Sequence, residues 1–400
     1  MGKATVRRAT HKKGSDPERP RWRILPPEIV HIIVEMLGTD KESLGSCALV
    51  SRDFTFAALC RLGRHISINT VRRLRECARL LANASAFQHV RSLDLGITTK
   101  KTIHQRDWDD YLIVLEAFAR RHTLNRLWFS EVPFYFSKRG NQERFGNTIS
   151  SLTTTVNELG LYSCHFSSYE EMISFIRAFP LCASLYVRDC VAQRNPAELN
   201  AFVRLPRHTL HINDLELTSS SNYKHLIDVS NLVKDAALDV SSLTGFTCEM
   251  SAADAVQQAL MITAASPIER LQLACDEAEG FHVLADPAIT GWQLQSLTIG
   301  PLIQKDDRWC ERALELSPNL PYLEYVTVSG SYSRPVRYLF WRRMDQLLSR
   351  QDLFPRLKRL DICVNEGSRR LRYREQQSIL QDLSNLSRAG KSASLNAIAP

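Results

Sequence analysis

Few residues of this chain have the types and spacing that catalysis or metal binding requires. The ten cysteines form no Cys-x-x-Cys pair and do not cluster with histidine, as a zinc site would require. His208 and His211 lie three residues apart, but no third metal ligand is near them in the sequence. Gly390, Lys391 and Ser392 lack the upstream glycine and the strand of a nucleotide-binding loop. Because no nucleophile motif or carboxylate pair stands out either, we expect no metal, no cofactor and no enzymatic activity.

The residues best suited to molecular recognition are aromatic and basic. Trp, Tyr and Arg are the residue types enriched at binding hot spots. Here they occur in short segments that alternate polar and apolar side chains, so we expect them on the open face of a sheet. The alternative is that they are ordinary solvated strand residues. The candidate substrate-binding residues are Arg126, Trp128, Tyr162, Tyr186 and Arg188.

These segments belong to a repeat. The pattern apolar-x-x-apolar-x-apolar occurs ten times, at a mean spacing of just under 30 residues, and its last three positions alternate as in a strand. The copies begin at residues 90, 124, 156, 182, 212, 243, 268, 294, 323 and 357, after an initial strand near residue 63.

Helical patterns lie between the repeated segments. Such patterns occur at residues 71–82, 106–121, 168–179, 251–265 and 336–350, whereas residues 130–147 form the longest predicted loop. Parallel strands joined by helices need right-handed crossovers. Because a unit of this length has no room for a second layer, each unit must stack on its neighbours. The sequence therefore predicts an α/β solenoid.

The repeated segments resemble leucine-rich repeats, whose consensus ends with Asn or Cys after the pattern Leu-x-x-Leu-x-Leu-x-x. Cys164, Cys190 and Asn365 occupy that last position in three copies. The resemblance implies a parallel sheet on the concave face and helices on the convex face. It also implies that Cys164 and Cys190 satisfy backbone groups in a turn, which favours a structural role over a redox or catalytic one.

The N-terminal region contains a helix that is apolar on nearly every side. The apolar residues of segment 24–37 are interrupted only by Glu28, His31 and Glu35. The two prolines near the start of this segment suit the first turn of a helix. A unit of about 40 residues cannot bury all sides of such a helix. An exposed apolar surface usually marks an interface, so we expect part of this helix to bind another protein.

Residues 25–62 resemble an F-box, in a style similar to the F-box proteins of mushroom-forming fungi. The family's opening Leu-Pro-x-Glu-Ile is found at Leu25–Ile29, and its Leu-Val-Ser-Arg-x-aromatic segment is found at Leu49–Phe54. Phe54 replaces the more common tryptophan. Three helices are expected, near residues 26–37, 41–49 and 51–62.

The F-box resemblance implies the substrate-recognition subunit of an SCF-type cullin-RING ubiquitin ligase. Such a subunit binds a Skp-type adaptor and, through it, a cullin, while other subunits transfer ubiquitin to a protein substrate. The alternative is an interaction scaffold without a ligase role, in which the N-terminal helices cap the solenoid. The residues expected to bind the adaptor are Leu25, Pro26, Ile29, Ile33, Leu44, Leu49, Val50 and Phe54.

These patterns divide the chain into four parts. They are a basic disordered arm (1–23), the F-box (24–62), the solenoid (63–388) and a flexible tail (389–400). The net charge is +8, of which +6 lies in residues 1–25; a nuclear localisation signal and a weak nucleic-acid contact are alternatives to a solvated leader. No signal peptide or membrane span is evident. We therefore expect a cytoplasmic or nuclear protein without membrane or nucleic-acid partners.

Overall fold

The structure is a computed structural model that divides into two units, Met1–Arg64 and His65–Pro400. The basic arm at residues 1–23 lies outside the described residues. The structure describes residues 25–38, 40–81, 89–96, 105–134, 139–192, 208–219, 232–233, 235–250, 252–275, 292–300, 320–331, 338–365 and 373–398.

The first unit contains the three helices that the sequence predicts: α1 (Pro27–Met36), α2 (Lys41–Ala48) and α3 (Arg52–Leu62). Each begins with a favourable residue. Pro27 occupies the first turn of α1, where its missing N–H costs nothing. The Asp40 carboxylate accepts a hydrogen bond from the Glu42 N–H at 3.1 Å, and the Ser51 hydroxyl accepts one from the Phe54 N–H at 3.4 Å.

The three helices share a small core of their own. It consists of buried side chains from each helix, with three half-buried side chains packed against them. The buried members are Val30, Val34, Leu44 and Ala57, and the half-buried ones are Leu37, Phe54 and Leu62.

The second unit is built on a parallel sheet of twelve strands, in which ten of the strands are the predicted repeats. Neighbours in the chain are neighbours in the sheet, apart from two short two-stranded pairs. The sheet strands are β1 (His65–Ile68), β2 (Ser92–Gly96), β3 (Arg126–Ser130), β4 (Glu158–Tyr162), β6 (Ser184–Arg188), β9 (Asp214–Ser219), β11 (Gly245–Met250), β12 (Arg270–Cys275), β13 (Ser296–Gly300), β14 (Tyr325–Ser331), β15 (Arg359–Asn365) and β16 (Ser392–Ile398). The short pairs are β5 (His165–Phe166) with β7 (Val191–Ala192), and β8 (Leu210–His211) with β10 (Leu238–Asp239).

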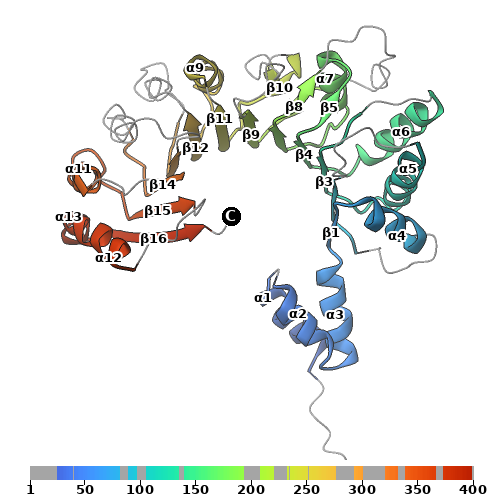
Figure 1. Cartoon of the computed structure of the whole chain (residues 1–400), viewed down its shortest axis with the longest axis horizontal. Coiled ribbons are helices and arrows are strands. Elements are labelled where there is room, and N and C mark those ends of the chain that lie inside the picture. The colour runs from blue at the N-terminus through green and yellow to red at the C-terminus, as the bar shows by residue number, and fades with distance from the viewer. Residues whose placement is uncertain are drawn as a thin grey trace, which may run out of the picture. The chain divides into compact units, whose positions relative to one another are not determined.

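Helices cover one face of this sheet, on the outer side of the curve in Figure 1. Packed helices need about 8–10 Å of spacing whereas strands need about 4.8 Å. The helices therefore lie on the outer, longer side of the curve and the sheet lies on the inner side. The predicted α/β repeat architecture, with a parallel sheet and helices on the outside, is confirmed. The helices are α4 (Val71–Leu81), α5 (Gln105–Ala119), α6 (Arg139–Leu152), α7 (Tyr169–Arg177), α9 (Ala253–Ile262), α11 (Tyr338–Leu348), α12 (Tyr373–Asp382) and α13 (Ser384–Arg388).

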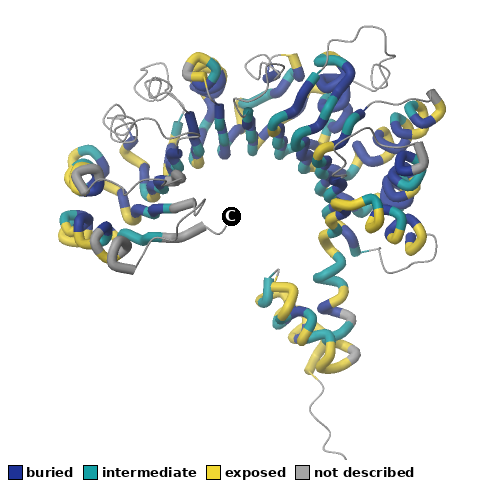
Figure 2. Tube along the Cα trace, viewed as in Figure 1, coloured by how far each residue is buried: buried dark blue, intermediate teal, exposed yellow. Residues whose placement is uncertain are grey.

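Equivalent residues of successive repeats lie side by side. Leu93, Leu127 and Leu159 are in register on β2, β3 and β4, and all three are buried. The polar residues between the apolar ones are mostly half-buried, as the alternating colours along the strands of Figure 2 show. One face of the sheet therefore forms the core with the helices, and the other face presents polar and aromatic side chains to solvent.

The predicted long loop at residues 130–147 is wrong from Arg139 onward, where α6 begins. Phe145, Ile149 and Leu152 follow one another at helical spacing, and all three are fully buried. Phe134, in the part before the helix, is also a core residue. The polar residues between these positions hide the helical pattern in the sequence.

The predicted structural role of Cys164 and Cys190 is confirmed. Both side chains are buried, and each thiol donates a hydrogen bond of 3.3 Å to a carbonyl oxygen on the strand of the preceding repeat. The acceptor is Phe129 on β3 for Cys164 and Leu161 on β4 for Cys190. Burial raises the pKa of the Cys164 thiol well above its usual value, so the nucleophilic thiolate is disfavoured.

The predicted flexible tail at residues 389–400 is also wrong. Strand β16 pairs with β15 along its whole length, and Ala393 and Leu395 pack against the core. Before the strand, the buried Lys391 ammonium donates hydrogen bonds to the carbonyl oxygens of Leu348 at 2.7 Å and Phe354 at 3.1 Å. This lysine ties the last strand to the end of α11.

Replacing Lys391 by methionine should lower the free energy of unfolding by about 1–3 kcal/mol, because it leaves two carbonyl oxygens without their donor. Urea denaturation of the whole chain measures this change. The matched control is Lys358→Met, since Lys358 is solvent-exposed and its ion pair with Glu324 should contribute little to stability. Equal unfolding midpoints for the two variants would contradict the structural role of Lys391.

Candidate binding surface

The open face of the sheet carries a row of side chains that the register aligns from strand to strand. Trp128, Gly160 and Tyr186 are consecutive members of this row, on β3, β4 and β6. Glu216 on β9 and Thr247 on β11 continue it. The row contains both large aromatic side chains and an acidic group, which are suited to binding rather than to core packing.

Trp128, Tyr162 and Tyr186 form an aromatic block on this face. The Trp128 ring centroid lies 5.0 Å from that of Tyr162 and 5.5 Å from that of Tyr186. A Cβ atom at Gly160 would come within 2.9 Å of the Trp128 ring, so only glycine lets the indole lie across β4. The predicted proximity of the three aromatic residues is confirmed, and their role in binding stays a prediction.

Arg126 completes one side of the aromatic block. Its guanidinium carbon lies 3.7 Å from the Trp128 ring centroid, and its Nε lies 2.8 Å from Glu158 Oε1. The cation is thus held by an aromatic ring and a carboxylate at once. Burial raises the pKa of Glu158, and the charge of Arg126 opposes this shift. Arg188, the other predicted basic residue, is exposed, is in register with Tyr162 and lies 3.8 Å from Asp189 Oδ2.

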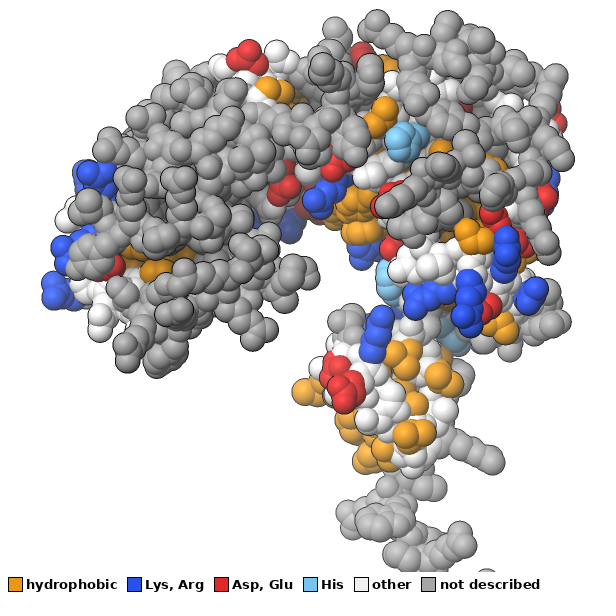
Figure 3. All heavy atoms as spheres, viewed as in Figure 1, with side chains coloured by type: hydrophobic (Ala, Val, Ile, Leu, Met, Phe, Trp, Pro, Cys, Tyr) orange, Lys and Arg blue, Asp and Glu red, His pale blue; other side chains and the backbone are white. Residues whose placement is uncertain are grey.

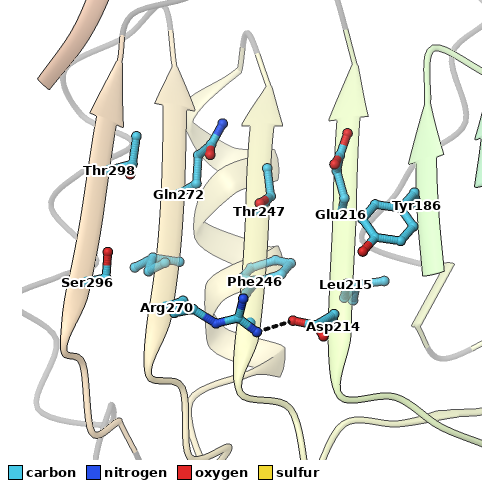
Figure 4. A pocket seen from close by; sticks show the side chains of 12 residues that line it. Tyr186, Asp214, Leu215, Glu216, Phe246, Thr247, Arg270, Gln272, Ser296 and Thr298 are labelled. Atoms are coloured by element: carbon cyan, nitrogen blue, oxygen red, sulfur yellow. Dashed lines mark hydrogen bonds and ion pairs between the residues drawn. The ribbon is translucent and has the colours of Figure 1, made fainter. Parts of the chain in front are cut away.

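Next to the aromatic block is an open hollow of about 290 Å³, which Figure 4 shows from close by. Arg270 on β12 and Asp214 on β9 form an ion pair of 2.6 Å that crosses the intervening Gly245. A Cβ atom at Gly245 would collide with the Asp214 carboxylate, so this glycine permits the crossing. The lining residues are Tyr186, Asp214, Leu215, Glu216, Gly245, Phe246, Thr247, Arg270, Leu271, Gln272, Ser296 and Thr298.

Two carboxylates give the region of the hollow an acidic character. Burial raises the pKa of Glu216, and the nearby charge of Glu249 raises it further, while the charge of Arg188 opposes the shift. Glu249 accepts a hydrogen bond of 2.6 Å from the Gln272 amide. A cation that entered the hollow would relieve the repulsion between Glu216 and Glu249.

Sequence reasoning missed four residues of this surface. Glu158, Asp214 and Gly245 begin their strands in register with one another or with the basic residues Arg126 and Arg270. They could have been found from the sequence, because residues two positions before Gly160, Glu216 and Thr247 lie on the same face of the sheet. Glu249 lies two residues after Thr247, so the same rule would have found it.

Five of the residues expected to bind an adaptor lie on the surface of the first unit. Leu25 and Ile29 are each 41% exposed, Leu49 and Val50 are 89% and 68% exposed, and Pro26 is exposed as well. Apolar side chains with this exposure are available to a partner.

The other three expected residues lie deeper. Ile33 is half-buried, and Phe54 packs against the core of the three helices. Leu44 is 1% exposed, so the expectation that it contacts an adaptor is wrong. It faces α1 and α3 because an amphipathic helix as short as α2 needs its one large apolar side chain for the core.

The exposed side of α1 includes two apolar residues that the sequence did not assign. Ile32 and Met36 are 52% and 82% exposed, and with Ile29 they follow the helical spacing of one face. The opposite side holds the buried Val30 and Val34. Figure 3 shows hydrophobic side chains gathered on the surface of this unit. The structure thus assigns which side of the apolar helix is internal and which is open.

The described residues contain no group of three potential metal ligands and no helix long and apolar enough to cross a membrane. His211 contacts Asp239 at 2.7 Å on the surface, and His208 is exposed.

No protein-family model matches the chain, and no curated protein matches it. Among solved structures, a chain from the crystal structure of the yeast Rad7 and Elc1 complex is similar. The sequence identity is 12%, the TM-score is 0.33 and the match covers 86% of each chain.

Proposed function

We propose that this chain is the substrate-recognition subunit of an SCF-type ubiquitin ligase. The first unit binds a Skp-type adaptor, and through it a cullin, while the open face of the second unit binds a protein substrate. The chain performs no chemistry itself, and other subunits transfer ubiquitin. The observation that carries the proposal is the exposed apolar side of α1, formed by residues such as Ile29, Ile32 and Met36, in a unit whose sequence resembles an F-box.

The exposed side chains are sufficient to hold a partner. Burying one large aliphatic side chain contributes roughly 1.5–3 kcal/mol. Several such side chains covered together offset the entropy lost on association. Leaving them in water has no benefit for the unit itself, because Val30 and Val34 already form its core. A protein partner explains the distribution of apolar residues on α1.

The second unit supplies the substrate side of the proposal. Its aromatic block and the adjacent hollow combine Trp, Tyr and Arg with carboxylates on a solvent-facing sheet. These residue types are enriched where protein interfaces have their strongest contacts. The partner that they recognise is therefore expected to be a protein.

The proposal is tested by affinity purification of the whole chain, followed by mass spectrometry of its partners. The wild-type chain should retain a Skp-type adaptor and a cullin, and the Leu25→Ala/Pro26→Ala double variant should lose both. Substrates bound to the second unit should be retained by both chains, because those residues are unchanged.

Two outcomes would contradict the proposal. One is an adaptor that remains bound to the double variant, which would place the contact elsewhere. The other is a wild-type chain that retains other proteins but no adaptor and no cullin, as the scaffold alternative predicts.

A further inference from the structure

We propose that the hollow, which extends from β6 to β13, binds an arginine side chain of the substrate at its β6 end. This inference rests on the proposed function, because it names the chemistry that the substrate side of the chain selects. The guanidinium group would stack on Tyr186 and form an ion pair with Glu216, two residues that are in register on adjacent strands.

The chain itself contains an arginine bound in this way, on the strands beside the hollow. The Arg126 guanidinium lies over the Trp128 ring at 3.7 Å and pairs with Glu158 at 2.8 Å. Here an aromatic ring and a carboxylate from neighbouring strands hold one guanidinium group on the open face. Tyr186 and Glu216 likewise place an aromatic ring and a carboxylate on neighbouring strands, here as direct cross-strand partners that both line the hollow.

The charges around the hollow favour a cation. Asp214 and Arg270, which both line it, neutralise each other through their ion pair at 2.6 Å. Arg188 is the cation that acts most on Glu216, but it is exposed and lies 3.8 Å from Asp189. Glu216 and Glu249 therefore contribute negative charge that the described basic residues compensate only in part.

The side chains that line the hollow favour arginine over lysine. A guanidinium group is planar, so it can stack on the Tyr186 ring while it donates several hydrogen bonds. The hydroxyl group of Thr247, which is in register with Glu216 on the next strand, also lines the hollow and supplies a further acceptor. An ammonium group cannot stack, and it keeps its hydration more strongly. Figure 4 shows these polar groups on adjacent strands, facing the same side of the sheet.

The test is the selection of random dodecapeptides, displayed on phage, by the immobilised full-length chain. Nonspecific attraction to a chain of net charge +8 would enrich acidic peptides, so enrichment of arginine reports a specific site. We expect arginine at one fixed position of the selected peptides. We also expect this preference to disappear with Glu216→Gln and to remain with the matched control Asp94→Asn. Asp94 is an acidic residue of the same row on β2, outside the hollow.

The selected peptide is then synthesised and titrated into each chain. Its affinity should fall at least about tenfold with Glu216→Gln, the loss expected for a charge-assisted hydrogen bond. Replacing the arginine of the peptide by lysine should also weaken binding. A selection without enriched arginine, or an arginine preference that Glu216→Gln leaves intact, would overturn the inference.

Adaptor binding is measured on the same preparations. If the wild-type chain binds no adaptor while the arginine preference is present, the proposed function fails and the arginine site stands. If the adaptor binds and the preference is absent, the inference fails and the proposed function stands.

Discussion

Replacing Trp128 by alanine should release the protein substrate and leave the adaptor bound. The indole contacts Tyr162 and Tyr186 and supports the guanidinium of Arg126, so its loss removes the centre of the aromatic block. Truncation of a central hot-spot residue costs about 2–4 kcal/mol of binding free energy, which is roughly a 30- to 1000-fold loss of affinity. Quantitative mass spectrometry of the proteins that copurify with the whole chain measures the effect.

The matched control for this experiment is Thr327→Ala. Thr327 is a half-buried residue of the same row on β14, outside both the aromatic block and the hollow. It should leave all partners bound. Retention of every partner by the Trp128→Ala chain would show that the aromatic block does not contact the substrate. Thermal unfolding of both variants checks that the second unit remains folded.

Replacing Phe175 by alanine should lower the free energy of unfolding of the second unit by about 3–5 kcal/mol, the range for a fully buried phenylalanine. Phe175 is 0% exposed and lies at the centre of a cluster of phenylalanines, with ring centroids 5.3 Å from Phe134, 5.4 Å from Phe179 and 5.7 Å from Phe129. The cavity would open between α7 and β3, directly behind the aromatic block. Urea denaturation followed by circular dichroism measures the loss.

Leu181→Ala is the control for the phenylalanine cluster. Leu181 lies close to Phe179 in the chain but is 54% exposed, so its truncation should change stability by no more than about 0.5 kcal/mol. If the two variants unfold at the same urea concentration, the phenylalanine cluster does not stabilise the unit as described.

The sheet was predictable because one pattern recurs ten times, and recurrence compensates for the weakness of each copy. The missed strand β16 alternates Ala393, Leu395 and Ala397 with polar residues, so its strand period is present. The strand also follows the repeat spacing, since Ser392 pairs with Arg359, but small alanine side chains make its period weak and Gly390 stands where the pattern begins with an apolar residue. Helix α6 was missed for a related reason, since its apolar residues are separated by polar ones such as Arg144 and Asn147.

The open face was predictable from strand periodicity, whereas its pairings were not. The repeat pattern places Trp128, Gly160 and Tyr186 on one side of the sheet in consecutive strands, but only the structure shows that the indole lies across Gly160. The same holds for the ion pair of Asp214 and Arg270, which lie 56 residues apart in the chain. Both contacts cross a strand at a glycine, because a larger side chain at that position would block them. A pattern of alternating polar and apolar residues does not show where such a glycine is required.

The internal and open sides of α1 could not be separated by sequence because both are apolar. Val30 and Val34 form one side, while Ile29, Ile32 and Met36 form the other. Leu44 was misassigned for the same reason, since a match to the F-box pattern does not distinguish a core residue from a contact residue. The fold separates them by exposure.

The measurement that tests the central claim most directly is a calorimetric titration of a purified Skp-type adaptor into the full-length chain. The proposal predicts a complex of one adaptor per chain with a dissociation constant below about 1 µM, equivalent to roughly −8 kcal/mol. The Ile29→Asp/Ile32→Asp variant should show no binding, because it places two charges on the apolar side of α1. The control Leu80→Asp, at a residue of α4 that is 58% exposed, should bind normally. Absence of binding by the wild-type chain, or equal binding by the α1 variant, would contradict the claim.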